Sequence, residues 1–123
     1  MRLLLDTHAL IWWDEGVGLS PGAADAIRAA EQVYVSAASG WEIAIKSSRG
    51  RLTTRRRLVE AVAESGFEEL PVRLAHAEGV RDLPWHHRDP FDRMLVAQAL
   101  FDRLTVVTRD RIFAKYGVRT LKA

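Results

Sequence analysis

Apolar residues occur along this chain in short uninterrupted runs, separated by longer segments in which they recur every three or four positions. The runs at 2–5, 32–36 and 104–108 have the length of buried strands, and each of the latter two contains two valines. A third strand in chain order is predicted at 67–72, and a weak fifth strand at 118–121. The chain therefore offers about five short strands.

Helical patterns fill the segments between the strands. Ser20 before Pro21 and Asp89 before Pro90 are typical helix starts, because proline suits the first helical position. The predicted helices are 6–13, 19–30, 36–50, 55–66, 73–84, 90–103 and 110–117, of which 90–103 is strongly amphipathic and 73–84 is part loop.

Strands thus alternate with helices from one end to the other. This alternation predicts an α/β fold: a single three-layer α/β/α domain over residues 1–123, with a central, mostly parallel sheet of about five strands. In such sheets, ligands bind beyond the carboxyl ends of the strands, where the strand order reverses. Residues that directly follow strands are therefore the candidates for function.

Composition narrows the class of protein. The chain has 123 residues and no cysteine, which excludes a disulfide framework, a thiolate metal site and a cysteine nucleophile. The longest apolar run is far too short for a membrane span, and the opening residues do not read as a signal peptide, so we expect a cytoplasmic protein.

Five acidic residues stand where strands end or helices begin: Asp6, Glu42, Asp89, Asp92 and Asp110. Each has a purely structural explanation. An aspartate is a common helix N-cap, which is our preferred reading of Asp89, and an acid in the first helical turn, such as Asp92, interacts favourably with the helix dipole. Glu42 lies three residues after Ser39, so the two would form a capping box.

The structural explanations do not account for four acids at one edge of the sheet. Asp6, Glu42, Asp92 and Asp110 would converge on one edge of the sheet, where their mutual repulsion calls for a cation. Carboxylates without cysteine suit Mg²⁺ or Mn²⁺. Zinc is disfavoured, because the four histidines lack the spacing of zinc ligands.

A basic segment, Arg49–Arg57, suggests a polyanionic partner. The net charge is only +2, but five arginines gather in this segment: Arg49, Arg51, Arg55, Arg56 and Arg57. They suit RNA contacts, or they simply form a solvated helix start. Carboxylate-bound metal beside a basic segment points to hydrolysis of a nucleic-acid phosphodiester by an activated water.

Four motifs in order make the chain resemble a known family. "LLLDTHALIWW", "VSAASGWEIAIK", "HHRDPFDRMLVAQA" and "LTVVTRDRIFAKYGV" resemble the PIN-domain toxins of the VapC family, the ribonucleases of VapBC type II toxin–antitoxin modules. The resemblance covers nearly the whole chain. It implies an Mg²⁺- or Mn²⁺-dependent endoribonuclease that usually forms a homodimer. It also implies inhibition by a VapB-type antitoxin, through which alone operator DNA is bound.

The resemblance also assigns roles to residues. Asp6 and Asp92 match the firmest metal ligands, and Glu42 and Asp110 complete the cluster around a metal-bound water or a second ion. Thr7 and Thr108 match small hydroxyl residues that support the acids. Asp89 is expected to be a helix N-cap that supports the metal ligands without binding the metal itself. We expect RNA products with 5′-phosphate and 3′-hydroxyl ends, and the sequence does not name the target RNA.

Other side chains give further expectations. Adjacent residues on a helix point about 100° apart, so Trp12 and Trp13 should not both face one core, and an exposed one would suit an antitoxin. The alternative is that loops cover both rings. Trp41 is expected in the core. Lys46 is expected to form an ion pair with Glu42, and Arg93 a similar surface salt bridge.

Three other Mg²⁺- or nucleotide-binding folds fit poorly. A haloacid dehalogenase-type phosphatase needs an aspartate where His8 stands, a receiver domain needs paired acids, and a dinucleotide fold needs an early glycine-rich turn. The remaining alternative is a catalytically inactive RNA- or protein-binding module of the same fold. It predicts that neutralising Asp92 leaves function intact and raises stability.

Overall fold

Strand β1 (Arg2–Leu5) lies at the centre of a five-stranded sheet because both of its faces are apolar. In the computed structural model of the chain, which describes residues 1–123, Leu3, Leu4 and Leu5 are all fully buried. β1 pairs on one side with β2 (Gln32–Ser36) and on the other with β4 (Thr105–Thr108), parallel in both cases. The strand that leads to the first acid is therefore the most protected in the molecule.

Two short strands form the edges of the sheet. β3 (Glu68–Leu70) pairs with β2, and β5 (Thr120–Lys122) pairs with β4, which gives the order β3-β2-β1-β4-β5. Every pair is parallel, so the predicted α/β fold with a mostly parallel sheet of about five strands is confirmed. The fifth strand begins two residues and ends one residue later than the predicted 118–121, and Val118 packs in the core just before it.

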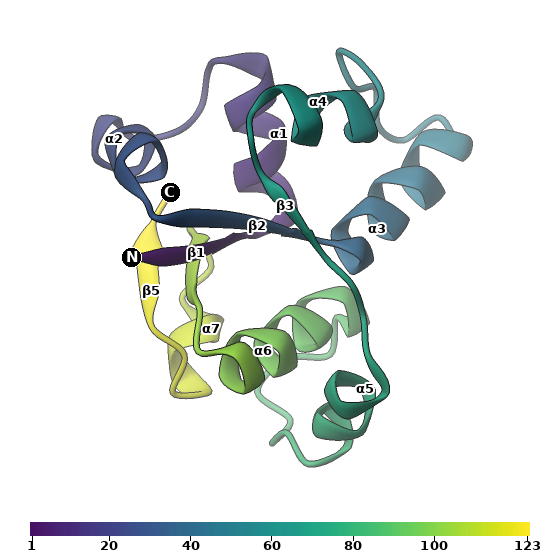
Figure 1. Cartoon of the computed structure of the whole chain (residues 1–123). Coiled ribbons are helices and arrows are strands. Elements are labelled where there is room, and N and C mark those ends of the chain that lie inside the picture. Colours follow the sequence, from purple (N-terminus) through teal and green to yellow (C-terminus); the bar gives the residue numbers. More distant parts are fainter.

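Seven helices connect the strands and cover both faces of the sheet (Figure 1). They are α1 (Thr7–Glu15), α2 (Pro21–Ala29), α3 (Ala37–Ser48), α4 (Leu58–Glu64), α5 (Leu74–Arg81), α6 (Pro90–Asp102) and α7 (Ile112–Lys115). α4 begins at Leu58, so three arginines predicted as helical precede it instead. No helix combines the length and the apolar character that a membrane span requires.

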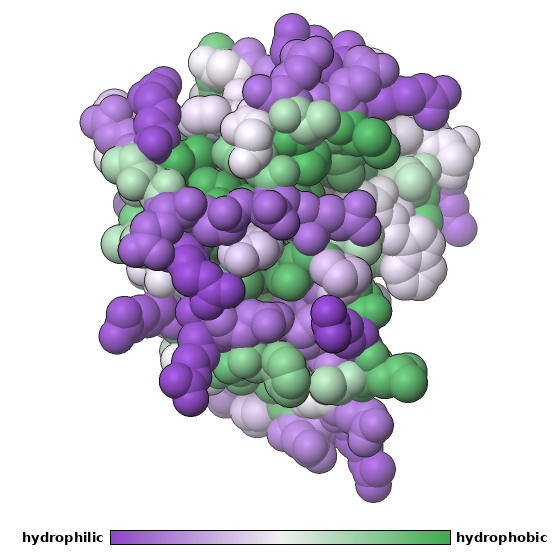
Figure 2. All heavy atoms as spheres, viewed as in Figure 1, coloured by the Kyte–Doolittle hydropathy of each residue, from purple (hydrophilic) through white to green (hydrophobic).

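The alternation of side chains along β1 divides the interior into two cores. Leu4 packs with residues of α6 and α7, whereas Leu3 and Leu5 pack with residues of α1 and α2. Figure 1 shows α1, α2 and α4 on one side of the sheet and α5, α6 and α7 on the other. In the same view, Figure 2 shows hydrophobic zones above and below a hydrophilic band at the level of the sheet. The helices on one side, the sheet and the helices on the other side are the three predicted layers.

The order of the strands reverses at β1. The chain runs from β1 outward to β2 and β3, then crosses back to β4 on the opposite side of β1. The direction of winding therefore changes between β1 and β4, so the chain leaves β1 into α1 on one face of the sheet and leaves β4 toward α7 on the other. Asp6 follows β1 directly and Asp110 follows β4 by two residues.

The expectation that Trp41 lies in the core is wrong, whereas Trp12 and Trp13 follow the alternative in which loops cover both rings. Trp41 is 65% exposed, because the inward face of α3 is occupied by Ser39, Glu42 and Ile43 instead. Trp12 and Trp13 are both partly buried and pack against the same core. Separate loops cover the two rings: a Cβ on Gly18 (φ +106°) would lie 2.5 Å from Trp12, and the Trp13 Nε1–H donates to the Ser65 hydroxyl over 3.1 Å.

Candidate functional site

Asp6 is fixed where β1 passes into α1. Its backbone N–H donates to the carbonyl of Val107 over 3.1 Å, which continues the sheet by one residue. Its Oδ1 accepts the N–H of Ala9 over 2.8 Å, so Asp6 is the N-cap of α1 as well as a candidate ligand. Burial raises the pKa of Asp6, although a hydrogen bond from Thr108 opposes the shift. Thr108, itself buried, thus supports this acid.

Asp110 is fixed by the loop that follows β4. Its N–H donates to the Thr108 hydroxyl over 3.0 Å, and its Oδ1 accepts the N–H of Ile112, the first residue of α7, over 2.9 Å. The Asp110 side chain remains 40% exposed. Thr108 therefore interacts with both Asp6 and Asp110, and the second Asp110 oxygen, Oδ2, lies 3.6 Å from His87 Nε2.

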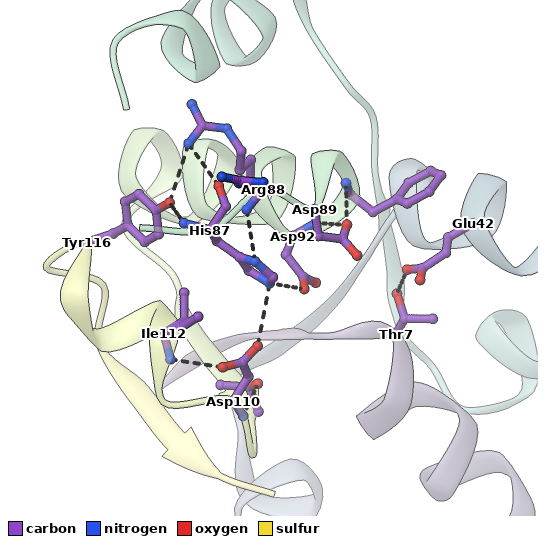
Figure 3. A network of polar contacts seen from close by, with 12 residues as sticks. Thr7, Glu42, His87, Arg88, Asp89, Asp92, Asp110, Ile112 and Tyr116 are labelled. Atoms are coloured by element: carbon purple, nitrogen blue, oxygen red, sulfur yellow. Dashed lines mark hydrogen bonds and ion pairs between the residues drawn. The ribbon is translucent and has the colours of Figure 1, made fainter. Parts of the chain in front are cut away.

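The start of α6 supplies the third acid. Asp89 Oδ1 accepts the N–H of Phe91 over 2.8 Å and of Asp92 over 3.1 Å, and Pro90 takes the first helical position. Asp89 is therefore the helix N-cap that the sequence indicates. Asp92 stands in the first turn with its side chain 23% exposed and directed toward Asp110 (Figure 3).

Glu42 lies on the inward face of α3 rather than near its start. Ser36 is the N-cap of α3, so the predicted capping box of Ser39 with Glu42 is wrong. Glu42 Oε1 accepts the Thr7 hydroxyl over 2.6 Å, and Oε2 accepts Lys46 Nζ, also over 2.6 Å. This confirms the expected ion pair, which holds the pKa of Lys46 above its usual value. Glu42 is the acid whose charge is best balanced by the protein itself.

His87 belongs to the site and escaped the analysis of the sequence. Its Nε2 lies 2.8 Å from Asp92 Oδ2 and 3.6 Å from Asp110 Oδ2. One ligand atom from each of these three residues lies within 4.8 Å of the others. The only signal for His87 in the sequence is its position, five residues before Asp92.

Asp92 carries the charge that the protein balances least well. Burial, followed by repulsion from Asp89, raises the pKa of Asp92 to about 6, while the hydrogen bond with His87 opposes the shift and Glu42 adds to it. Asp110 likewise disfavours the ionised form of Asp6. The acids are thus close enough to repel one another. Asp92 and Asp110 place ligand atoms within 4.8 Å of each other and of His87, whereas Asp6 and Glu42 lie outside this group and act on it through repulsion. The hard oxygen donors of the four acids suit Mg²⁺ or Mn²⁺.

Arg93 does not form the expected surface salt bridge. It is only 3% exposed and turns away from Asp92, because the carbonyl oxygens of the preceding loop converge on its guanidinium. Its nitrogens donate to Pro84, Val80, Leu83 and His87 carbonyls and to the Tyr116 hydroxyl. Arg93 is therefore part of the support for the site.

The basic segment divides into two groups. Arg55 Nη2 lies 3.4 Å and Arg56 Nε 2.9 Å from Asp14 Oδ1, and Arg56 also pairs with Glu64, so these two arginines attach the segment to α1 and α4. Arg49, Arg51 and Arg57 are exposed and form no ion pair. These three arginines are therefore available to bind a polyanion.

Comparisons with known proteins agree with this architecture. The family model of the PIN domain matches residues 3–119. Ribonuclease VapC22 of Mycobacterium tuberculosis is 32% identical over 118 residues, which cover 89% of this chain and 87% of the relative.

Two solved structures share the fold. DNA-bound VapBC from Salmonella typhimurium has a chain that superposes with a TM-score of 0.74 at 19% identity, covering 98% of this chain and 97% of that one. FitAcB from Neisseria gonorrhoeae gives a TM-score of 0.67 at 21% identity, covering 98% and 96%.

The raised pKa of Asp92 predicts a specific effect of pH on stability. The folded state binds this proton more tightly than the unfolded state, where the pKa of aspartate is about 3.9. The contribution of Asp92 is therefore most favourable below about pH 4 and is lost as the pH rises through about 6. In EDTA at about pH 7.5, Asp92→Asn should increase the free energy of unfolding by about 1–3 kcal/mol.

Urea unfolding over this pH range measures the effect. Asp25→Asn is the matched control, because Asp25 is an 80% exposed aspartate on α2. The gain from Asp92→Asn should appear only as the pH rises, and the control should show none. A constant difference between wild type and Asp92→Asn at every pH would contradict the account.

Proposed function

The chain belongs to the PIN-domain family and is VapC-like, and from this premise we propose that it is a metal-dependent endoribonuclease, the toxin of a type II toxin–antitoxin module. One observation carries the proposal: four carboxylates from separate parts of the sequence gather at the carboxyl edge of β1 and β4. Their repulsion is only partly relieved by neighbouring cations. Such an arrangement costs stability and is explained by binding of a cation.

We propose that Asp6, Asp92 and Asp110 hold an Mg²⁺ ion, or Mn²⁺ in its place, and that Glu42 completes the cluster. Asp92 and Asp110 keep their side chains partly open to solvent, at 23% and 40%. When bound, the ion lowers the pKa of a coordinated water and neutralises charge that develops on the phosphate. The site has no cysteine, and this chemistry requires no side-chain nucleophile.

The other side chains of the site hold charges and protons in place. Thr7 donates to the Glu42 carboxylate from inside the protein, and the Ser39 hydroxyl lies 3.2 Å from that of Thr7. Lys46, 44% exposed, adds a positive charge at the rim and would attract an RNA phosphate. Asp89 keeps Asp92 in the first turn of α6. The expected products are RNA fragments with 5′-phosphate and 3′-hydroxyl ends.

An antitoxin of the VapB type is the proposed protein partner. The solved structures that share the fold include DNA-bound VapBC and another toxin–antitoxin complex, from Klebsiella pneumoniae. A hollow of about 260 Å³ beside Trp12 and Trp13 offers apolar surface for such a partner. We propose that the chain acts as a homodimer and reaches operator DNA only through the antitoxin.

Cleavage of RNA tests the enzymatic proposal. Purified protein should cut total cellular RNA into discrete fragments in Mg²⁺ or Mn²⁺ and should be inactive in EDTA. Asp92→Asn should lower the rate by at least about 100-fold, because an amide replaces the charged ligand oxygen. Gel electrophoresis measures the cleavage. Asp92→Asn, purified identically, controls for contaminating nucleases, and Asp25→Asn, at an 80% exposed aspartate, should cleave like wild type.

Two results would contradict the proposal. Products that end in 2′,3′-cyclic phosphate would show that the ribose hydroxyl attacks instead of water. Intact RNA from folded, antitoxin-free protein, with undiminished RNA binding by Asp92→Asn, would favour the inactive binding module.

The free arginines give a prediction about RNA affinity. Replacing Arg49, Arg51 and Arg57 together by alanine should weaken RNA binding and reduce the dependence of log Kd on log salt by about two, because each phosphate contact on single strands contributes about 0.7. Fluorescence anisotropy in Ca²⁺, at several salt concentrations, measures both quantities. An unchanged salt slope would show that the segment does not contact RNA.

A further inference from the structure

The loop before α6 is held in one conformation by a buried guanidinium. Arg93 donates to the carbonyls of Pro84 over 2.9 Å and Val80 over 3.0 Å, and to Leu83 and His87 over 3.3 and 3.4 Å. The indole of Trp85 stacks on its other side, 3.9 Å from ring centroid to guanidinium carbon. No carboxylate pairs with Arg93, so its charge is balanced by these carbonyl oxygens and the ring.

Tyr116 joins this loop to the C-terminal part of the chain. Its buried hydroxyl receives Arg93 Nη1 over 3.4 Å and the backbone N–H of His87 over 2.8 Å (Figure 3). The backbone of His87 is therefore fixed by a residue that does not itself touch the acids. Loop position and imidazole position are set together.

The hydrogen bonds of the imidazole determine which nitrogen carries the proton. His87 Nδ1 accepts the backbone N–H of Arg88 over 3.1 Å, so Nδ1 is an acceptor. A neutral imidazole has one donor and one acceptor nitrogen, so Nε2 is the donor. Nε2 lies 2.8 Å from Asp92 Oδ2, whereas the 3.6 Å to Asp110 exceeds hydrogen-bond distance. His87 thus donates to one carboxylate oxygen and leaves the other free.

We propose that His87 is a positioning residue for metal binding, which acts by donating Nε2–H to Asp92 Oδ2 and does not coordinate the ion itself. This inference rests on the proposed function, in which Asp92 is a metal ligand. Carboxylates that bind metals are usually held by hydrogen bonds from neighbouring groups, and loss of such a partner typically weakens binding by about 10–100-fold. Coordination by Nε2 would require the proton on Nδ1, where the Arg88 N–H already points.

Mn²⁺ binding, measured by electron paramagnetic resonance of the free ion at about pH 8, tests the inference without using activity. His87→Phe keeps a ring but removes the donor, and should weaken Mn²⁺ binding by about 10–100-fold. His87→Gln places an amide N–H₂ near the position of Nε2 and should retain most of the affinity. His86→Phe, at the exposed neighbouring position, should bind like wild type.

Tyr116→Phe provides a second, independent variant. It removes the hydroxyl that holds the His87 backbone and should weaken Mn²⁺ binding in the same direction, with a smaller effect than His87→Phe. Circular dichroism at the temperature of the binding measurement establishes that each variant is folded.

Three outcomes separate the possible failures. Unchanged or tighter binding by folded His87→Phe would overturn the inference, and tighter binding would mean that the imidazole competes with the ion. Direct ¹⁴N coupling to bound Mn²⁺ in wild type, absent in His87→Phe, would overturn it in favour of an imidazole ligand. Undiminished binding by Asp92→Asn would instead refute the proposed metal site itself.

Discussion

Repulsion among carboxylates at the carboxyl edge of β1 and β4 is the constraint around which the rest of this site is arranged. The protein relieves it unevenly. Glu42 is neutralised by Lys46, and Asp6 is held by a helix N-terminus and a hydroxyl. Asp92 retains a pKa of about 6, because burial and Asp89 disfavour its charged form more than His87 favours it. A divalent ion would supply the positive charge that Asp92 lacks.

The fold makes such crowding possible because rigid parts of the chain deliver each acid separately. β1 is buried on both faces and ends at Asp6, and α6 begins with a capped turn that carries Asp92. The loop between α5 and α6 contributes Leu83 to the core, and Arg93 binds its backbone carbonyls. A buried cation without an acidic partner is costly unless many dipoles surround it. The loop's carbonyl groups meet this requirement and thereby fix His87.

Much of this arrangement could be predicted from the sequence, because it depends on local patterns. Strand and helix alternation gave the three layers, and the Asp89-Pro90 pair gave the start of α6. Long-range polar contacts were not predictable in this way. Arg93 faces inward because the carbonyls of α5 and the following loop converge on it, a convergence that no periodic pattern of residues records. Trp41 faces outward because Glu42 takes the inner position. The roles of the candidate site residues in catalysis and binding stay predictions until they are measured.

The central claim is that the acids at this edge of the sheet bind a divalent cation. Anomalous diffraction from a crystal soaked in Mn²⁺ tests it most directly, because the signal locates the ion without reference to activity. The account predicts a peak between Asp92, Asp110 and Asp6, with Glu42 nearby and the His87 imidazole outside the coordination shell. The claim would be contradicted if a crystal showed Mn²⁺ elsewhere but no peak at these four carboxylates, with all four accessible to the soaking solution.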